Sequence, residues 1–302
     1  MKWNDRMRAL MVLASALQCC NVAAADSRTV NIHKAAEPDG AVEIENVAGK
    51  VEVTGWDRAE VEVTGTIGER VESVDVNSSP GHTTVRVVLP QGLWGSRWVG
   101  GGGAEAALVV HVPRRSLLMA TLVSAGITTR GLQGQQQLRT VSGSIDGELA
   151  HEAKINTVSG SVKLAAGAGP LEVNSISGTI TVKGATGELR VGTVSGSAEL
   201  ELGAITRARF QTVSGAVSAS GALAAGAELE ATSVSGSLRF TLKGAADYDI
   251  NSFSGSIDNC FGPKAQRSGY GPGTHLVFRQ GDGNARVRLG TQSGSIQLCD
   301  HP

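Results

Sequence analysis

The chain has 302 residues and a net charge of −1, with 40 glycines, 8 prolines and an apolar fraction of 41% that includes only 4% aromatic residues. A core must therefore be built from Val, Ile, Leu and Ala, and the composition favours short strands with tight turns over long helices. The balanced charge argues against a nucleic-acid binder, which normally carries a basic excess, and the length suits one large domain or two ordinary ones.

Residues 1–25 have the pattern of a secretory signal peptide. Basic residues come first (Lys2, Arg6 and Arg8), an apolar run follows at Ala9–Leu17, and alanines fill positions 23–25. We predict cleavage before Asp26. Lipoprotein modification of Cys19 or Cys20 is the weaker alternative, because Gln18 and Cys19 stand where small residues should. The apolar run is too short to span a bilayer, and no later run is long enough, so we expect an exported chain without a transmembrane span.

Residues 26–113 form an N-terminal region that alternates between apolar and polar side chains, as in Val51-Glu52-Val53 and Val61-Glu62-Val63. A period of two predicts strands with one buried face. The periodicity is weaker here than in the rest of the chain, and the terminal units of repeat proteins are usually atypical. We therefore expect this β region to cap or continue the repeats of residues 114–302. A separate small β domain is the alternative.

The segment QGLWGSRWVGGGG, residues 91–103, is the most unusual in the chain. It carries Trp94 and Trp98 with Arg97 between them, and a run of glycines follows. Tryptophan rings can stack on sugar faces or lie at a membrane interface. These three residues are therefore the candidate ligand or partner contact. The competing interpretation is a loop whose rings pack back onto the protein.

From residue 114 onward a short motif, TVSGSI in its first full copy at Thr140–Ile145, recurs at intervals of about 18 residues. The central serines are Ser142, Ser159, Ser177, Ser195, Ser214, Ser235, Ser254 and Ser293. Such a period indicates stacked structural units. Apolar and polar residues alternate on both sides of each Ser-Gly pair, which predicts strand, corner, strand and turn in every unit. The predicted fold is thus all-β: a single-stranded parallel β-helix, or β-solenoid, with coils of about 18 residues.

The Ser-Gly pairs have a structural interpretation in such a fold. Glycine tolerates backbone angles at the corner that are costly for other residues, and small hydroxyl side chains can hydrogen-bond backbone groups freed there. A catalytic serine needs a base and an oxyanion site, and no histidine lies next to the repeated serines. We therefore predict a structural serine ladder and no catalytic residue.

A column of charges five residues before each central serine tests the register. Its members are Gln137, Lys154, Glu172, Arg190, Arg209, Glu230, Asp249 and Arg288. Opposite charges across neighbouring strands stabilise a sheet by about 0.2–1 kcal/mol each, and like charges destabilise it. Most steps alternate in sign, but Arg190–Arg209 and Glu230–Asp249 do not. Pairing of Asp249 with Arg288 predicts that their coils are adjacent, with an outward insertion near residues 261–283.

Three stretches of the chain together carry a family resemblance. They are VEIENVAGKVEVTGWDRAEVEV (42–63), VVHVPRRSLLMATLVSAG (109–126) and the TVSGSI copies. In this order they resemble the DUF4097 family of bacterial proteins, which are called adhesins by analogy. The resemblance covers nearly all of the mature chain and implies an exported β-solenoid of the single-stranded β-helix kind, with no established activity. The glycine-rich loop around Gly100 and the insertion after Cys260 depart from the family pattern.

Cys260 and Cys299 each lie six residues after a central serine, so they occupy the same column. On adjacent coils their Cα atoms would be about 5 Å apart, within the disulfide range of about 4.4–6.8 Å. An exported chain has few reasons to keep two free thiols. We therefore predict a Cys260–Cys299 bridge that staples the C-terminal coil.

A glycan-cleaving β-helix enzyme is the least favoured alternative. Its two carboxyls would lie about 5–9.5 Å apart, which acids in one column on adjacent coils satisfy. Glu230 and Asp249 have that spacing, but a charge column explains them better. The histidines are scattered without metal-ligand spacing, at His33, His82, His111, His151, His275 and His301. No metal site or cofactor is predicted.

The predicted function is a non-catalytic binding or adhesin-like module of the bacterial cell envelope, in the periplasm, at the cell surface or secreted. Its partner would be an envelope or surface component, with a glycan among the candidates and nucleic acid excluded. The alternative is an envelope scaffold or a stress-associated accessory protein without an adhesive role.

Overall fold

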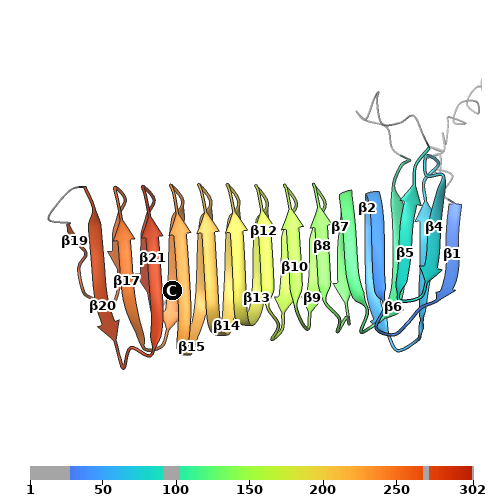
Figure 1. Cartoon of the computed structure of the whole chain (residues 1–302). Coiled ribbons are helices and arrows are strands. Elements are labelled where there is room, and N and C mark those ends of the chain that lie inside the picture. The colour runs from blue at the N-terminus through green and yellow to red at the C-terminus, as the bar shows by residue number, and fades with distance from the viewer. Residues whose placement is uncertain (1–27, 91–102, 268–271, 301–302) are drawn as a thin grey trace, which may run out of the picture.

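The computed structural model describes residues 28–90, 103–267 and 272–300. All regular structure in these ranges is β-strand, and they contain no helix that would be able to cross a membrane. The predicted signal peptide and the candidate residues Trp94, Arg97 and Trp98 lie outside the described residues. Figure 1 shows the strands stacked side by side into an elongated rod.

The strands fall into three groups along the chain. The N-terminal region contains β1 (Arg28–Ala35), β2 (Ala41–Trp56), β3 (Glu60–Ile67), β4 (Ser73–Ser79), β5 (His82–Val88) and β6 (Ala106–Pro113). The repeats contain β7 (Leu117–Arg130), β8 (Gln136–Thr140), β9 (Ile145–Leu149), β10 (Ala153–Thr157), β11 (Val162–Ala166), β12 (Leu171–Ser175), β13 (Thr179–Thr193), β14 (Ser197–Thr212), β15 (Ala216–Ser233) and β16 (Ser237–Lys243). The C-terminal part contains β17 (Ala246–Ser252), β18 (Ile257–Asn259), β19 (Gln266–Arg267), β20 (Thr274–Gln280), β21 (Ala285–Thr291) and β22 (Ile296–Cys299).

Successive coils pair in parallel, and each step along the rod is one full repeat. In the first arm of the coil, which ends at the Ser-Gly corner, Ile155 pairs with Leu138 on one side and with Val173 on the other. The second arm, which begins after the corner, pairs in the same way. The corners line up along one edge of the rod, at the top of Figure 1. The described chain is therefore an all-β, solenoid-like stack.

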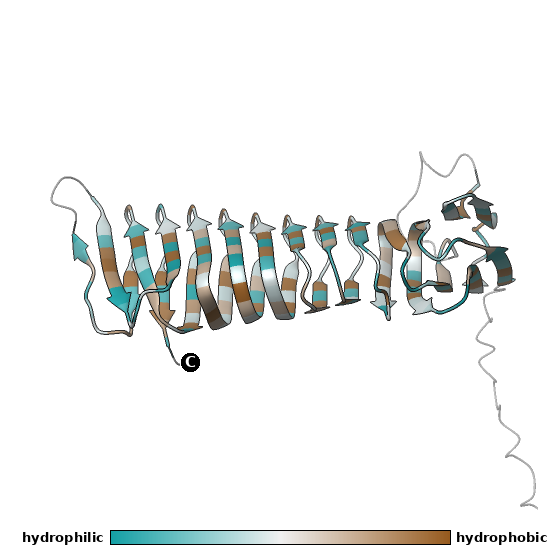
Figure 2. Cartoon of the chain, turned by 60° about the horizontal axis from the view of Figure 1, so that its bottom comes forward, coloured by the Kyte–Doolittle hydropathy of each residue, from teal (hydrophilic) through white to brown (hydrophobic). Residues whose placement is uncertain are grey.

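The core lies between the two arms and is mainly aliphatic. Buried and exposed positions alternate along the strands, which Figure 2 shows as bands of opposite hydropathy. Ile155 and Val173 of the first arm and Ile180 of the second arm are completely buried. Phe210 and Phe240 are an aromatic pair within this core, with ring centroids 5.7 Å apart.

Two columns of hydroxyl groups hold the corners. At the first position of the motif, Thr193 Oγ1 accepts a hydrogen bond of 3.0 Å from the Gly196 amide, and the other copies repeat this contact. At the central position, Ser195 Oγ donates to the carbonyl oxygen of Ile176 in the neighbouring coil at 3.3 Å. The other central serines donate in the same way. The serine ladder thus links each coil to the next.

The corner glycines are needed for a different reason from the one predicted. None of the corner glycines of the eight motif copies has a φ in the left-handed region, so the expected need for unusual backbone angles is wrong. Instead, a Cβ added at Gly178 would lie 1.9 Å from the carbonyl oxygen of Gly160 in the neighbouring coil. The coils approach so closely at their corners that only a residue without a side chain fits.

The N-terminal region continues the stack and then closes it. β2 pairs in parallel with β7 along both arms, and its Asn46-Val47-Ala48-Gly49 segment forms a degenerate corner next to residues 122–125. β5 and β6 pair in parallel with the other side of β2. Three antiparallel pairings follow, β3 with β6, β1 with β3 and β4 with β5. Antiparallel pairing uses backbone groups that an open parallel edge would expose.

At the C-terminal end the coils do not follow the order of the sequence. β21 pairs in parallel with β15 on one side and with β17 on the other, and β22 lies in the same way between β16 and β18. The predicted adjacency of Asp249 and Arg288 is confirmed. The expectation that the coils of Glu230 and Asp249 are direct neighbours is wrong, because the coil of Arg288 lies between them.

The segment predicted as an outward insertion near residues 261–283 instead closes the end of the stack. β20 pairs antiparallel with β17, and β19 pairs antiparallel with β20. Figure 1 shows these strands at the end of the rod opposite to β1. The rings of Tyr248, Phe261 and Phe278 pack together there, with centroids between 4.7 and 5.7 Å apart. The cap therefore has an aromatic core of its own.

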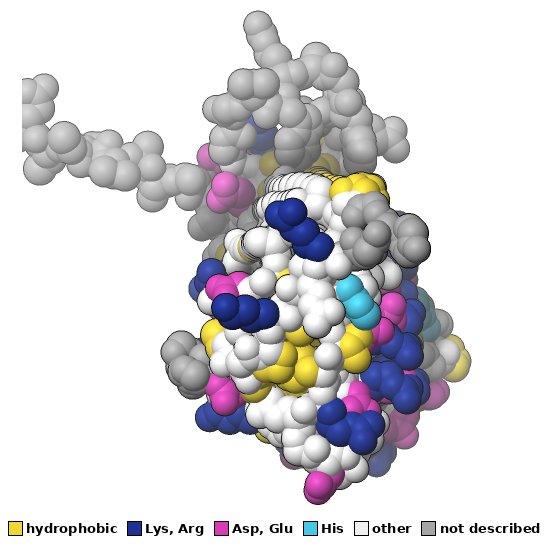
Figure 3. Space-filling view, turned by 90° about the vertical axis from the view of Figure 1, so that its left-hand side faces the viewer, with side chains coloured by type: hydrophobic (Ala, Val, Ile, Leu, Met, Phe, Trp, Pro, Cys, Tyr) yellow, Lys and Arg dark blue, Asp and Glu magenta, His cyan; other side chains and the backbone are white. Residues whose placement is uncertain are grey.

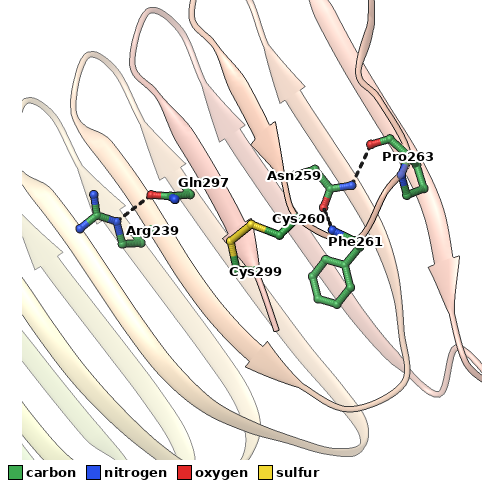
Figure 4. The surroundings of a disulfide bond; sticks show 7 residues. All are labelled: Arg239, Asn259, Cys260, Phe261, Pro263, Gln297 and Cys299. Carbon is green, nitrogen blue, oxygen red and sulfur yellow. Dashed lines mark hydrogen bonds between the residues drawn. A yellow bond between two sulfur atoms is a disulfide. The ribbon is translucent and has the colours of Figure 1, made fainter. Parts of the chain in front are cut away.

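A disulfide joins Cys260 to Cys299, with Cα atoms 4.8 Å apart, close to the distance predicted from the register. Figure 4 shows the bridge beside Phe261, with the Arg239–Gln297 hydrogen bond nearby. The bridge holds the coil formed by the C-terminal strands β21 and β22, as predicted, but this coil lies inside the stack and not at its end. It joins this inserted coil to the outermost one.

Candidate interaction surface

The exposed large apolar side chains of the described residues are concentrated along the corner edge. An apolar residue precedes the central serine in nearly every copy of the motif. These residues form a column, the corner ridge, made of Val123, Val141, Val158, Ile176, Val194, Val213, Val234 and Phe253. Their exposed fractions run from 40% to 58%, and the ninth large apolar residue exposed to this degree, Val277, lies elsewhere. Gln292 interrupts the column before Phe253.

The ridge follows from the local structure of the corner. Thr193 and Gly196 are buried, and the two residues between them, Val194 and Ser195, are exposed. Neighbouring coils repeat this arrangement at a spacing of about 4.8 Å. Contacts between β-branched neighbours stabilise a sheet, but they do not require almost half of each side chain to stay in water. A continuous apolar patch on a protein surface marks an interaction site.

The columns beside the ridge on this edge carry no charge. The central serines form the first of them, and a column that includes Ser161, Thr179 and Ser197 follows the corner glycines. Throughout the coils from residue 140 to 238, this edge therefore presents aliphatic and hydroxyl side chains only. We call the ridge and these two columns together the corner edge.

A shallow groove of about 470 Å³ lies beside the ridge on the first-arm side. Ridge residues Ile176, Val194 and Val213 line it together with Thr157, Ser175, Thr193 and Thr212 from the motif's first position and Asn156, Asn174, Gly192 and Gln211 from the preceding column. Gly192 leaves a gap in the last column, and Asn174 Oδ1 lies 2.7 Å from where a Cβ of residue 192 would be. None of the lining residues is charged.

The amide of Asn174 is held in one orientation. Its Nδ2 atom donates to Glu172 Oε1 at 2.9 Å and to Asn156 Oδ1 at 3.3 Å. Lys154 hydrogen-bonds the same carboxylate and keeps the pKa of Glu172 below its usual value, so Glu172 remains an acceptor at neutral pH. The Asn174 Oδ1 atom is consequently directed over Gly192, where it has no donor among the described residues.

Charged residues form a separate flank on the outer face of the first arm. Lys154 lies 3.1 Å from Glu172, and Arg209 lies 2.7 Å from Glu230. Figure 3, viewed onto the C-terminal end, shows basic and acidic side chains interleaved along one side of the rod. Arg288 stands between the two carboxylates that sequence spacing made a candidate catalytic pair, Glu230 and Asp249.

A second hollow of about 370 Å³ lies on this flank, between β21, β17 and β20. Asp247 lies 2.6 Å from Arg279, which lowers the pKa of Asp247, and Arg286 lies 3.4 Å from Glu228. The polar groups of the hollow therefore belong largely to ion pairs between neighbouring strands.

Two histidines that are far apart in sequence meet on the N-terminal cap, which sequence spacing did not reveal. Glu62 lies 3.4 Å from His33 and 3.3 Å from His111, and the His111 ring stacks on Trp56 at 5.0 Å. Arg58 covers the Trp56 ring at 4.8 Å. No group of three or more His, Cys, Asp or Glu residues within the described ranges is arranged to hold a metal ion.

The fold agrees with the comparison to protein families. The family model described as Toastrack DUF4097 matches residues 16–299, so the chain belongs to this family. No protein of curated function matches the chain.

Solved structures from three bacteria match the chain, and one of them has a TM-score above 0.5. The one named "Putative lipid binding protein", from Parabacteroides distasonis ATCC 8503, has 16% identity and a TM-score of 0.52, covering 90% of this chain and 96% of its own. A "putative adhesin" from Bacteroides fragilis NCTC 9343 has 9% identity and a TM-score of 0.41, with coverage of 90% and 97%. A "putative cell adhesion protein" from Clostridium sporogenes ATCC 15579 has 10% identity and a TM-score of 0.28, with coverage of 90% and 99%. At these identities the likeness concerns the fold alone.

Proposed function

We propose that the chain is a non-catalytic, exported binding module of the cell envelope, in which the corner edge contacts an envelope or surface partner. The observation that carries this proposal is the corner ridge, where apolar side chains between 40% and 58% exposed follow one another along the rod. Folding does not require these side chains to be apolar, since they point away from the core. A partner that covers them removes apolar surface from water, which favours binding.

The solenoid is suited to this task as a single-stranded parallel β-helix. One strand–corner–strand unit per coil gives a straight, rigid edge, because every coil repeats the same backbone hydrogen bonds. Many equal and weak contacts along such an edge act together on an extended partner. The predicted signal peptide supports a location outside the cytoplasm, in the periplasm or at the cell surface.

We also propose that the protein is not an enzyme. Glycan cleavage would need two carboxyls facing one bond, and the pair with suitable spacing in the sequence is separated by Arg288. The repeated serines donate their hydroxyl hydrogens to backbone carbonyls of neighbouring coils. A role in holding the coils together accounts for them.

Substitution of the ridge tests the proposal. The triple variant Val158→Ser, Ile176→Ser and Val194→Ser removes apolar surface from three consecutive coils and leaves the core unchanged. We expect it to bind isolated envelope fractions about tenfold or more weakly than the wild-type mature protein in a co-sedimentation assay.

A matched triple variant serves as the control. Lys163→Ser, Thr181→Ser and Glu199→Ser change the outer face of the second arm in the same three coils, so they should leave envelope binding unchanged. Equal binding by the ridge variant and the wild type would show that the corner edge is not the contact surface. Unchanged circular dichroism spectra establish that both variants fold.

A further inference from the structure

We propose that the groove beside the corner ridge binds a single chain of a neutral polysaccharide, which lies along the axis of the rod. This inference rests on the proposed function and names the partner class of the same surface. It is carried by the composition, the size and the periodicity of the groove.

The composition of the groove fits a neutral, hydroxyl-rich ligand. Its lining combines amides of Asn156, Asn174 and Gln211 with hydroxyls and aliphatic side chains, and no charge is among them. An amide both donates and accepts hydrogen bonds, as a sugar hydroxyl does, and aliphatic side chains can cover the C–H faces of a sugar ring. An anionic polymer would instead require Arg or Lys at the contact.

The size of the groove argues against a folded protein as its occupant. Eleven residues line it, whereas a stable protein interface uses about 20–30 residues on each side. A second copy of this chain would therefore be held weakly there. A single polymer chain contacts fewer residues and fits a groove of this size.

Periodicity gives a polymer an advantage over its monomer. Equivalent positions recur in each coil at about 4.8 Å, so successive sugar units meet a ridge side chain in each coil and an amide in the coils of Asn156, Asn174 and Gln211. Individual contacts of this type are weak, but those of a linked chain reinforce one another through effective concentration. Affinity should therefore rise with the length of the oligosaccharide.

The ligand meets an unused acceptor above Gly192. The neighbouring Asn174 uses both N–H groups within the protein, on Glu172 and Asn156, which leaves its Oδ1 atom directed over Gly192 with no donor among the described residues. This atom is a prepositioned acceptor for a sugar hydroxyl. A Cβ at residue 192 would lie 2.7 Å from this oxygen, so a side chain there must displace the Asn174 amide.

The test measures binding of the mature protein to insoluble cellulose, chitin and mixed-linkage β-glucan, with alginate and heparin as anionic polymers and phosphatidylethanolamine–phosphatidylglycerol vesicles for comparison. We expect saturable binding to at least one neutral polysaccharide, and tighter binding of longer soluble oligosaccharides from it. Gly192→Val should weaken this binding about tenfold or more, because its side chain must displace the Asn174 Oδ1 acceptor.

Gly290→Val is the matched control. Gly290 occupies the same column in β21, has open space around its Cβ position and lies outside the groove. We expect wild-type binding from this variant. Equal losses in the two variants would overturn the placement of the ligand in this groove.

Two further outcomes separate this inference from the function on which it rests. Binding to none of the neutral polysaccharides, or only to anionic polymers or vesicles, would contradict the inference that the ligand is a neutral polysaccharide. If envelope fractions still bind the wild type but not the ridge variant, the proposed binding function remains supported although this ligand class is wrong. Digestion of the envelope fractions with a glycoside hydrolase that cleaves the bound polysaccharide should abolish binding if the inference is correct, and unchanged binding after complete digestion contradicts it.

Discussion

The corner glycines lie where two coils come closest together. Cβ atoms built at Gly160, Gly178 and Gly196 would lie 1.8, 1.9 and 2.1 Å from the carbonyl oxygen of the preceding corner glycine. The obstacle is backbone, which cannot move aside without breaking the pairing of both coils. The coils can approach this closely because glycine has no side chain, and the serine hydroxyl then bridges them.

Gly178→Ala is expected to destabilise the protein by about 2–3 kcal/mol, as overpacking of a core does. Its control is Gly290→Ala, since no atom lies within 4 Å of the added Cβ there, and we expect a change within about 0.5 kcal/mol. Chemical denaturation of both variants followed by circular dichroism provides the comparison. Equal midpoints would contradict the close stacking of the corners.

The role of the hydroxyl residues at the corner was predicted correctly from the sequence, whereas the reason for the corner glycine was not. The small hydroxyl residues were expected to bind backbone groups, and Thr193 and Ser195 do so. The requirement for glycine was assigned to backbone angles, because the spacing between coils cannot be read from one repeat. The ridge did leave a signal: Val194 is apolar in a position where the alternation of buried and exposed residues predicts a polar one.

At the scale of the strand, the charge column fixes how neighbouring coils align. Lys154, Glu172 and Arg190 face one another in consecutive coils, and the like-charge step from Arg190 to Arg209 is offset by Glu188, which lies 3.6 Å from Arg190. A strand shifted by one residue would separate these pairs and turn the core residues outwards. The column therefore adds to the register that the buried residues already specify.

Glu172→Lys would place three cations in consecutive coils. We expect destabilisation of about 0.5–1.5 kcal/mol at low ionic strength, relieved by added salt. Thermal unfolding with and without sodium chloride measures the effect. An unchanged melting temperature at low salt would mean that these side chains do not act on one another.

The same pair predicts a pH dependence, with Glu172→Gln as the comparison. The hydrogen bond from Lys154 lowers the pKa of Glu172 from its ordinary 4.5. The charged carboxylate therefore stabilises the native state above that pH, and this contribution is lost as the pH falls through the lowered value. Wild type should be the more stable of the two at neutral pH, and the difference should vanish in acid.

The register between neighbouring coils was predictable from the columns of equivalent residues in the repeats, whereas one coil with a degenerate motif was not recognised. The columns of Leu138, Ile155 and Val173 pair as their spacing predicts. Residues 26–113 were expected to cap or continue the repeats, but the coil formed by β2 was not singled out, because Asn46 and Ala48 replace the Thr and Ser of the motif, although Val47 and Gly49 keep its pattern. The pairing of β2 with β7 places this coil in the stack.

At the scale of the whole molecule, the charges also select the order of the coils. If β17 stacked directly on β15, as the sequence order suggests, Asp247 and Asp249 would face Glu228 and Glu230. Insertion of β21 places Arg286 and Arg288 between these acidic pairs. Like charges directly opposite each other are destabilising, so the wrong order is disfavoured. The sequence alone did not predict this order, because an adjacent Asp249 and Arg288 are compatible with either arrangement.

The disulfide makes this order permanent, and its removal is the last prediction. Cys260 and Cys299 are separated by 39 residues, so on the chain-entropy model Cys260→Ser with Cys299→Ser should cost about 3–4 kcal/mol of stability. Because β21 and β22 pair with coils on both sides, hydrogen exchange should accelerate in β15 and β16 as well as in β17 and β18. Acceleration confined to β21 and β22 would indicate a terminal coil and contradict the inserted one. Mass spectrometry of unreduced mature protein from the periplasm is the accompanying control. Two free thiols there would show that the bridge does not form, and the arginine–carboxylate pairings alone would then maintain the order of the coils.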